Sequence, residues 1–209
     1  MENQTENLCV IGICGKPGAG KDTIGNFLIV DYGFCNLTLK KPIEDAVKAI
    51  FTVGDNHLYD RDMREQPMPD WPNWTVRKAL QYVGQVMREA VGNDVWGKNL
   101  CKRIDGLIND SREFDAVVNN VNVVVTDIRT PGDVKTLRDY VAEKHGKFIL
   151  MMVSRPGYGS TTAGGFANHQ LESYDLSSEC DIVFVNDGTI DVLQEAVRDY
   201  LISTQAIKN

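Results

Sequence analysis

One short stretch, residues 13–23, contains the residue types that bind phosphate. It reads ICGKPGAGKDT and nearly matches the phosphate-binding pattern G-x-x-x-x-G-K-[S/T], since Gly15, Gly20 and Lys21 are in register. Asp22 stands where the pattern has a hydroxyl residue, and a threonine follows one place later. The stretch therefore predicts a phosphate loop with an altered last position.

Each part of this stretch has a role in holding a nucleotide phosphate. Glycines let the backbone wrap the phosphates, amides point inward at a helix N-terminus, and the lysine reaches the β- and γ-phosphates. The apolar run 8–14 is typical of a buried strand, and helical signals begin at Lys21. The alternative is a strand–helix connection whose glycines only permit tight packing. We predict that ATP contacts Gly15, Lys16, Gly18, Ala19, Gly20, Lys21, Asp22 and Thr23.

The altered last position concerns the metal. In the stricter pattern the residue after the lysine gives its hydroxyl to Mg²⁺, and Thr23 is the candidate to do so from the next position. Asp22 has two interpretations of similar weight: a carboxylate that suits the dipole at a helix N-terminus, or a metal ligand. Lys16, inside the loop, adds positive charge near the terminal phosphate.

A second cationic surface is predicted in the segment 74–92, WTVRKALQYVGQVMREAVG. Its apolar residues recur at helical spacing and form a core-facing stripe. Arg77, Gln81, Gly84 and Arg88 recur at intervals of four, three and four, so they share another face of the same helix. Arginine forks bind phosphate, an amide reads a base edge, and a mid-helix glycine lets a group approach closely. The alternative is an ordinary solvated face.

Charged residues also follow two of the later apolar runs. Asp127 and Arg129 come at the end of the run 121–127, and Arg155 comes directly after the run 147–154. We predict that Asp127 orients Mg²⁺ or the attacking group, that Arg129 holds an acceptor phosphate, and that Arg155 closes over the transferring phosphoryl group. The alternative for the first two is a structural ion pair. In many such folds the loop after the last strand holds adenine, and the candidates here are Asn186, Asp187 and Gly188.

The elements that must position these residues alternate along the chain. Buried strands are predicted at 8–14, 121–127, 147–154 and 181–186, and helices at 21–32, 131–145 and 190–202. This alternation predicts a doubly wound α/β sheet, whose ligands bind beyond the carboxyl ends of the strands. Between 39 and 110 only helices are predicted, at 43–51, 76–91 and 94–108, which indicates an insertion. The Gly-, Ser- and Thr-rich segment 156–178 is the candidate lid.

Composition limits the class of protein. The chain has 209 residues, with 43% hydrophobic and 24% charged residues, which is typical of one globular domain. Its net charge of −7 argues against a nucleic-acid partner, because phosphate backbones require a basic surface. Five scattered cysteines indicate reduced thiols in a cytoplasmic protein, and we expect neither a signal peptide nor a membrane partner.

Taken together, these stretches resemble the deoxynucleoside monophosphate kinases of tailed bacteriophages. The resembling pieces are GKPGAGKDT, WTVRKALQYVG with Trp96 after it, VTDIR, SRPG, HQLES and DIVFVNDGT, in the order of that family. The resemblance implies a three-layer α/β/α P-loop kinase-like fold with a mostly parallel sheet. It implies a single domain over 1–209, with its core at 7–38, 115–155 and 180–205, a helical acceptor-binding insertion at 39–110 and a lid at 156–178.

The resemblance also implies an activity. The family transfers the γ-phosphoryl group of ATP, with Mg²⁺, to a deoxynucleoside 5′-monophosphate (dNMP) and forms the diphosphate and ADP. By matching position, Lys16 and Lys21 would contact ATP phosphates, and the lid motif would contribute His169 and Glu172. The residues around the acceptor would be Arg77, Gln81, Trp96, Asp127 and Arg129. The expected location is the host cytoplasm, and a homodimer is the candidate assembly.

Two other functions remain open from the sequence. The same donor loop serves kinases of other small phosphorylated acceptors, such as dephospho-coenzyme A or phosphomevalonate. A regulator that retains ATP without turnover is a third interpretation. Either kinase reaction depends mainly on positioning and on neutralisation of charge. Lys21 would act on the donor, Arg77 and Arg129 on the acceptor, and Arg155 on the transferring group.

Overall fold

The computed structural model describes residues 7–113, 120–157 and 174–207, and the chain divides into two compact units. The first, which we call the sheet unit, comprises Met1–Thr38 and Gly97–Asn209. The second, the insertion unit, comprises Leu39–Trp96. His169 and Glu172, predicted to belong to a lid, lie outside the described residues.

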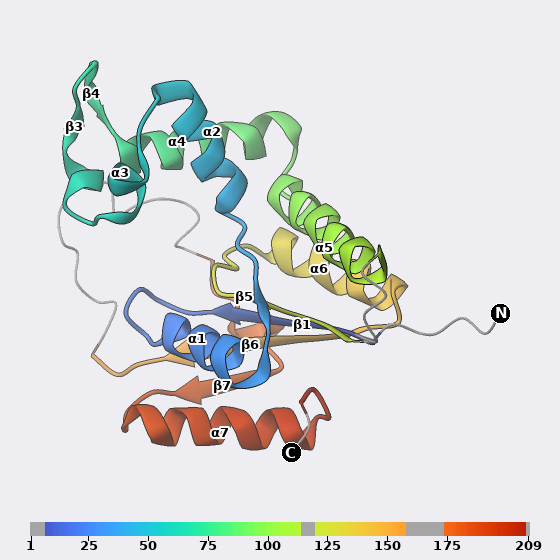
Figure 1. Cartoon of the computed structure of the whole chain (residues 1–209). Coiled ribbons are helices and arrows are strands. Elements are labelled where there is room, and N and C mark those ends of the chain that lie inside the picture. The colour runs from blue at the N-terminus through green and yellow to red at the C-terminus, as the bar shows by residue number, and fades with distance from the viewer. Residues whose placement is uncertain (1–6, 114–119, 158–173, 208–209) are drawn as a thin grey trace. The chain divides into compact units, whose positions relative to one another are not determined.

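The sheet unit is built on a parallel sheet of five strands (Figure 1). Their order is β2 (Cys35–Asn36), β5 (Asn120–Val125), β1 (Asn7–Cys14), β6 (Lys147–Ser154) and β7 (Ile182–Val185). Every neighbouring pair is parallel, so all carboxyl ends lie at one edge of the sheet. The strand β1 is central, and its carboxyl end leads directly into the glycine loop.

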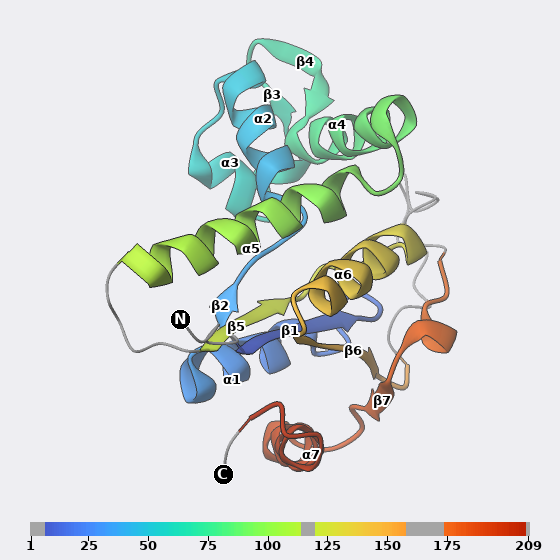
Figure 2. The same ribbon diagram turned by 90° about the vertical axis from the view of Figure 1, so that its right-hand side faces the viewer.

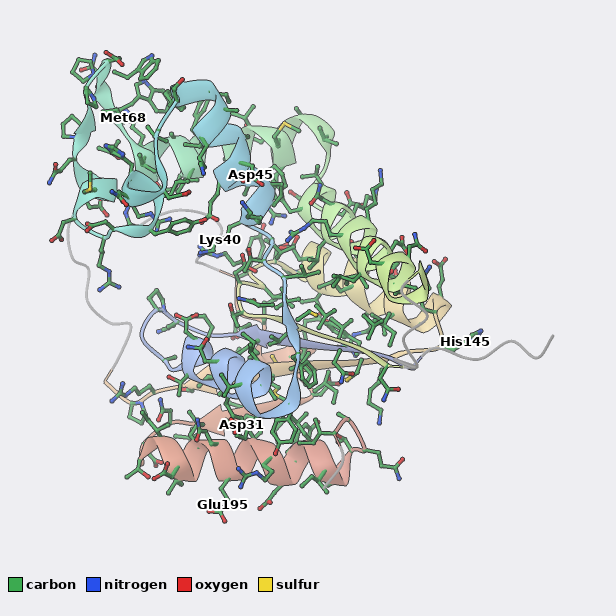
Figure 3. The ribbon with its side chains drawn as sticks, in the orientation of Figure 1. Asp31, Lys40, Asp45, Met68, His145 and Glu195 are labelled. Atoms are coloured by element: carbon green, nitrogen blue, oxygen red, sulfur yellow. The ribbon has the colours of Figure 1, made fainter. Side chains whose placement is uncertain are left out.

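Helices cover both faces of this sheet, as Figures 1 and 2 show. Helices α1 (Lys21–Tyr32) and α7 (Ile190–Ser203) lie on one face, and α5 (Val95–Glu113) and α6 (Pro131–Glu143) lie on the other. Charged residues such as Glu195 on α7 point away from the sheet (Figure 3). The predicted three-layer α/β/α fold with a mostly parallel sheet is therefore confirmed.

The central strand shows why the layers pack. In β1, alternate residues Cys9, Ile11 and Ile13 are buried in one cluster with Leu28 of α1 and Val197 of α7. Side chains alternate between the two faces of a strand, so the intervening residues of β1 lie against the other helical layer. An apolar run such as LCVIGIC therefore folds as a strand that is buried on both faces.

Helices α6 and α7 begin at threonine caps. The hydroxyl of Thr130 accepts a hydrogen bond from the backbone N–H of Asp133, at 3.2 Å, and also donates to the Asp133 carboxylate at 2.8 Å. The hydroxyl of Thr189 accepts from the backbone N–H of Val192 at 3.4 Å. Such caps satisfy N–H groups that have no partner within the helix, and they fix where each helix begins after its strand.

The insertion unit has its own small core. Its elements are α2 (Lys41–Phe51), α3 (Asp55–Tyr59), the 3-10 helix η1 (Met63–Glu65), β3 (Pro67–Met68), β4 (Trp71–Thr75) and α4 (Val76–Val91). Val47, Leu58, Met68, Val76 and Ala79 form a buried cluster in this unit. Met68, labelled in Figure 3, brings the β3 strand into that core.

The antiparallel pair of β3 and β4 differs from the sequence expectation, which had only helices in this region. Proline lacks the N–H that a strand ladder uses, so the segment QPMPDWPNW gives no strand pattern. The pair is also short and irregular, with a register shift between Pro67 and Met68. The compact insertion unit ends at Trp96, and α5 from Gly97 onward belongs to the sheet unit. The acceptor-binding insertion at 39–110 stays a prediction.

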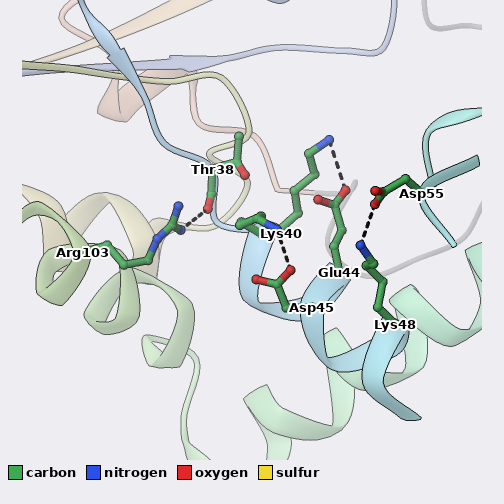
Figure 4. A network of polar contacts seen from close by, with 8 residues as sticks. Thr38, Lys40, Glu44, Asp45, Lys48, Asp55 and Arg103 are labelled. Carbon is green, nitrogen blue, oxygen red and sulfur yellow. Dashed lines mark hydrogen bonds and ion pairs between the residues drawn. The ribbon is translucent and has the colours of Figure 1, made fainter. Parts of the chain in front are cut away.

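Polar contacts hold the ends of these segments (Figure 4). In the sheet unit, Arg103 of α5 donates to the backbone carbonyl of Thr38 at 2.7 Å. In the insertion unit, Lys48 of α2 pairs with Asp55, the first residue of α3, at 2.6 Å. The buried carboxylate of Glu44 lies 3.4 Å from Lys40 Nζ, one helical turn before it.

Most predicted elements are confirmed. Helices α1 and α4 and strand β6 have the predicted bounds, and the other long elements differ by a few residues at their ends. The sequence reading missed β2, α3, η1 and the 3-10 helix η3 (Ser177–Glu179), which are all short. Among the described residues, no helix has both the length and the apolar composition that a membrane span requires.

Replacing Gly25 by alanine tests the close approach of α1 to the end of β5. The new Cβ would lie 2.5 Å from Thr126 Cγ2, so either helix α1 or the Thr126 side chain must move. Gly106 of α5 is the matched control, because a Cβ there meets nothing within 4 Å. We expect Gly25→Ala to lower the free energy of unfolding by about 1–2 kcal/mol. Gly106→Ala should raise it by up to about 1 kcal/mol.

The measurement is chemical denaturation of both variants beside the wild type. Similar changes of the same sign in the two variants would show that helix propensity, and not the contact with Thr126, decides the effect at Gly25.

Candidate functional site

The glycine loop after β1 has backbone geometry that requires glycine. Gly15, Gly18 and Gly20 have φ angles of 134°, 76° and 112°. A Cβ on Gly15 would lie 2.2 Å from the backbone oxygen of Val153, and one on Gly20 would lie 2.7 Å from Asn186 Nδ2. The loop therefore packs tightly against the ends of two other strands. The loop also borders a cavity, so these glycines do more than permit tight packing.

Lys21 crosses its own loop. Its Nζ donates to the carbonyl oxygen of Gly15 at 2.8 Å and to that of Lys16 at 2.9 Å. The same Lys16 oxygen accepts from the backbone N–H of Ala19 at 3.2 Å, so a turn closes inside the loop. These contacts hold the ammonium group over the loop, where an anion would meet it.

Helix α1 begins at this loop. Gly20 is its N-cap residue and has no side chain, and no side chain among the described residues caps this helix end. A helix N-terminus carries a partial positive charge, so the first turn after Gly20 favours an anionic group. Asp22 is exposed and Thr23 is half-buried in that first turn.

A cavity of about 330 Å³ opens beside the loop. The glycine loop, the end of β6 and the segment after β7 supply its walls. Its lining residues are Gly18, Gly20, Lys21, Asp22, Thr23, Arg155, Asn186, Gly188, Ile190 and Leu193. The first eight of these were predicted from the sequence, and the structure brings them together. Two cations, Lys21 and Arg155, thus share one cavity at the carboxyl edge of the sheet.

Asn186 ties the segment after β7 to the loop. Its Nδ2 donates to the backbone oxygen of Ala19 at 2.8 Å, and its backbone N–H donates to the backbone oxygen of Ser154 at 2.7 Å. Its amide is therefore engaged with the loop backbone. Asp187, the third adenine candidate, is exposed and does not line the cavity.

Ile190 and Leu193 are the lining residues that the sequence reading missed. Both belong to the first turn of α7, whose amphipathic pattern suggested only a core-facing helix. Leu193 is buried, but Ile190 has an exposed fraction of 60%. The sequence offered only an isoleucine directly after Asn186 to Gly188, in phase with the apolar stripe of the helix, so its exposure is seen only in the structure.

Asp127 and Arg129 lie in the connection between β5 and α6. Ile128, between them, is buried, and a Cβ on Gly12 would lie 2.4 Å from its Cδ1. The cap at Thr130 fixes the other end of the connection. Asp127 is half-buried and Arg129 is exposed, and neither is among the residues that line the cavity described above.

The cationic face predicted on α4 belongs to the insertion unit. Arg77 is exposed and forms an ion pair with Glu65 of η1. This partner comes from a different element, so helical spacing could not reveal it. Gln81 is half-buried on the same helix.

The rest of that face has structural contacts. Gly84 and Arg88 are buried. The indole Nε1 of Trp96 donates to the Gly84 oxygen at 3.2 Å, and Arg88 donates to the Asn93 oxygen after the helix. A Cβ on Gly84 would lie 3.3 Å from Ile43 Cδ1. The close approach predicted at Gly84 is therefore made by the protein itself.

A comparison with known proteins gives a relative in sequence. The chain is 31% identical over 192 residues to the protein of Acanthamoeba polyphaga mimivirus named "Putative deoxynucleotide monophosphate kinase". The match covers 88% of this chain and 91% of the mimivirus protein. No protein-family model matches the chain.

Solved structures of several kinases are similar at lower identity. The Mycobacterium tuberculosis APS kinase in complex with AMPPNP and APS is 15% identical, with 93% of this chain and 98% of that chain covered and a TM-score of 0.47. The shikimate kinase of Aquifex aeolicus is 11% identical, with 94% and 98% covered and a TM-score of 0.43.

The sequence relative, and not these structural neighbours, determines the assignment. It comes from a virus of a different kind than the bacteriophages of the sequence resemblance, so a phage origin stays a prediction. At 31% identity over most of both proteins, the chain belongs to the deoxynucleotide monophosphate kinase family.

Proposed function

We propose that the protein transfers the γ-phosphoryl group of ATP to a deoxynucleoside 5′-monophosphate and forms the diphosphate and ADP. The observation that carries this proposal is the cavity in which the glycine loop, Lys21 and Arg155 meet. Family membership supports the choice of acceptor.

The cavity has the two kinds of wall that ATP requires. Gly18, Gly20 and Lys21 offer backbone amides and a cation for the phosphates, and Ile190 and Leu193 offer apolar surface for adenine. Ligand pockets commonly combine apolar walls with a few placed polar groups. The phosphates would lie at the N-terminus of α1, which begins at the loop.

Mg²⁺ fits the polar residues that line this cavity. Thr23 offers a hydroxyl and Asp22 a carboxylate, and both line the cavity. Among the described residues there is no cluster of three or more His, Cys, Asp or Glu side chains that would bind a metal alone. Mg²⁺ commonly keeps waters and binds one or two protein ligands together with substrate phosphates, so Thr23 and Asp22 suffice. The metal would neutralise charge on the β- and γ-phosphates.

The chain's own residues provide positioning and charge. Lys21 and the amides of the first turn of α1 would hold the donor phosphates, and Arg155 would stabilise the charge of the transferring group. The attacking oxygen belongs to a phosphate that is already ionised at neutral pH, so the reaction requires no dedicated base. Asp127 and Arg129, at the carboxyl edge of the same sheet, are proposed for the acceptor.

The insertion unit would bind the acceptor through Arg77 and Gln81. In the structure Arg77 pairs with Glu65, but both side chains are about half exposed, at 45% and 53%. An exposed ion pair contributes only about 0.2–1 kcal/mol, so an acceptor phosphate can displace Glu65 from Arg77. Gly84, Arg88 and Trp96 would support this face from within the unit.

The first test is an ADP-release assay with Mg-ATP against a panel of deoxynucleoside and ribonucleoside monophosphates. We expect turnover with some deoxynucleotides, and a loss of about 100-fold or more in kcat for Lys21→Ala, because a preorganised charge on the transferred phosphate is removed. Lys135→Ala is the matched control, since Lys135 is 78% exposed and its ion-pair partner among the described residues is Asp139, which lies on the same helix.

Full activity in Lys21→Ala would contradict the role of the loop. Turnover with dephospho-coenzyme A or phosphomevalonate, but with no nucleotide, would show that the acceptor is not a nucleotide. ATP binding without any turnover would indicate a regulator.

The placement of adenine against the apolar lining is tested at Ile190. We expect Ile190→Ser to raise the KM for ATP about fivefold with little change in kcat, because about 1 kcal/mol of apolar contact is lost. Val192→Ser is the matched control, since Val192 is as exposed (57% against 60%) but does not line the cavity. Equal effects of the two substitutions in steady-state kinetics would refute the placement of adenine.

The acceptor end is tested by releasing Arg77. We expect Glu65→Gln to lower the KM for the dNMP about two- to fivefold, because the competing carboxylate charge is removed. Arg77→Ala should raise that KM about tenfold or more, since a charge-assisted bond to phosphate is lost. The KM for ATP, measured in the same variants, should not change. An unchanged dNMP KM in Arg77→Ala would place the acceptor phosphate elsewhere.

A further inference from the structure

Two thiols from distant parts of the sequence meet at the base of the glycine loop. Cys14 is the last residue of β1, and Cys180 lies between η3 and β7. Their Sγ atoms are 3.4 Å apart, although the residues are 166 positions apart in the chain. Both are free thiols, and Cys14 is buried while Cys180 is half-buried.

The backbone on each side keeps the two sulfur atoms together. Cys14 pairs with Met152 in the parallel ladder of β1 and β6. Next to Cys180, the backbone N–H of Asp181 donates to the Leu150 oxygen at 2.8 Å, and the Asp181 carboxylate accepts from the Leu150 N–H at 2.7 Å. Both cysteines are therefore fixed to the same strand, β6.

The contact makes the two thiols unequal. The hydrogen bond between them raises the pKa of Cys14, which burial raises further, and it lowers the pKa of Cys180 against the opposing effect of burial. In the neutral pair, Cys180 also donates to the Leu176 oxygen at 3.1 Å. Cys180 is thus the more acidic and the more accessible of the two, and a thiolate is the reactive form of cysteine.

The other cysteines do not share this arrangement. Burial raises the pKa of Cys9 and of Cys101 to about 11, so neither is a reactive thiol at neutral pH. Cys35 is exposed on β2, and no sulfur contact to it is found among the described residues. Cys14 and Cys180 form the only such pair in that part of the chain.

We propose that Cys14 and Cys180 form a reversible intramolecular disulfide at the base of the phosphate loop. With a small disulfide such as oxidised glutathione, the Cys180 thiolate attacks one sulfur atom and releases one glutathione thiolate. Cys14 then loses its proton, attacks the Cys180 sulfur of the mixed disulfide and releases the second thiolate. The two protein thiols lose two electrons and two protons, and the oxidant becomes two thiols.

The bond would act on the loop that holds Lys21. A disulfide is about 2.0 Å long, so the sulfur atoms must approach by about 1.4 Å from the 3.4 Å contact. Cys14 directly precedes Gly15, whose carbonyl holds Lys21 Nζ at 2.8 Å. If the proposed kinase function holds, oxidation should lower turnover about tenfold or more, because phosphoryl transfer depends on positioning within about 1 Å.

The test is non-reducing peptide mapping of the reduced full chain after incubation with oxidised glutathione and alkylation of the remaining thiols. We expect a cross-linked pair of peptides that contain Cys14 and Cys180, and its loss after reduction by dithiothreitol. Cys180→Ser should abolish the cross-link, and the control Cys35→Ser should keep it. Cys14→Ser should trap glutathione on Cys180.

A wild-type protein that carries a stable glutathione on Cys180, or that leaves Cys180 unmodified, would overturn the proposal. The map does not depend on activity, so it decides the disulfide even if the reduced protein transfers no phosphate. If the reduced protein is active and the cross-linked protein has the same turnover, the proposed effect of the disulfide on the phosphate loop is wrong.

Discussion

The close approach of Gly15 to the backbone of Val153 is the constraint on which the site depends. A side chain at Gly15 would meet the Val153 oxygen at 2.2 Å, so only glycine lets the chain turn at the end of β1. That turn brings two loop carbonyls under Lys21 Nζ and leads the chain into α1. The end of β6 therefore both supports the loop and continues into Arg155, which lines the same cavity. The end of one strand thus lies beside the loop of Lys21 and leads to Arg155.

The two compact units contribute differently to the proposed reaction, and the sheet unit, which also holds Asp127 and Arg129, contributes to both substrates. The sheet unit holds every residue that lines the donor cavity. The insertion unit holds the face with Arg77 and Gln81, and its core is made from its own short elements. The cysteine contact belongs to the sheet unit, and Cys14 directly precedes the donor loop, so its chemistry concerns that loop and not the face with Arg77 and Gln81.

The sequence predicted the parts that depend on local pattern and missed those that depend on distant contacts. The run before Gly15 and the helix after Gly20 were predicted because periodicity and glycine chemistry act over a few residues. The β3 and β4 pair was missed because prolines and short strands give no alternation. Glu65 could not be assigned to Arg77, since the two residues belong to different elements. The face on α4 was right in its spacing, but only packing shows that Gly84 and Arg88 are buried.

The strand order has a consequence for how the chain folds during synthesis. Strand β1 is made first, yet its two neighbours in the sheet are β5 and β6, which begin at Asn120 and Lys147. Pairings between such distant segments are slow, because a long loop must close before any contact is gained. The insertion unit, in contrast, is one continuous segment, Leu39–Trp96, so all of its contacts are available early. A ribosome-bound chain therefore holds an apolar strand without sheet partners until the second half of the protein emerges, and this interval is when the chain is most exposed to aggregation.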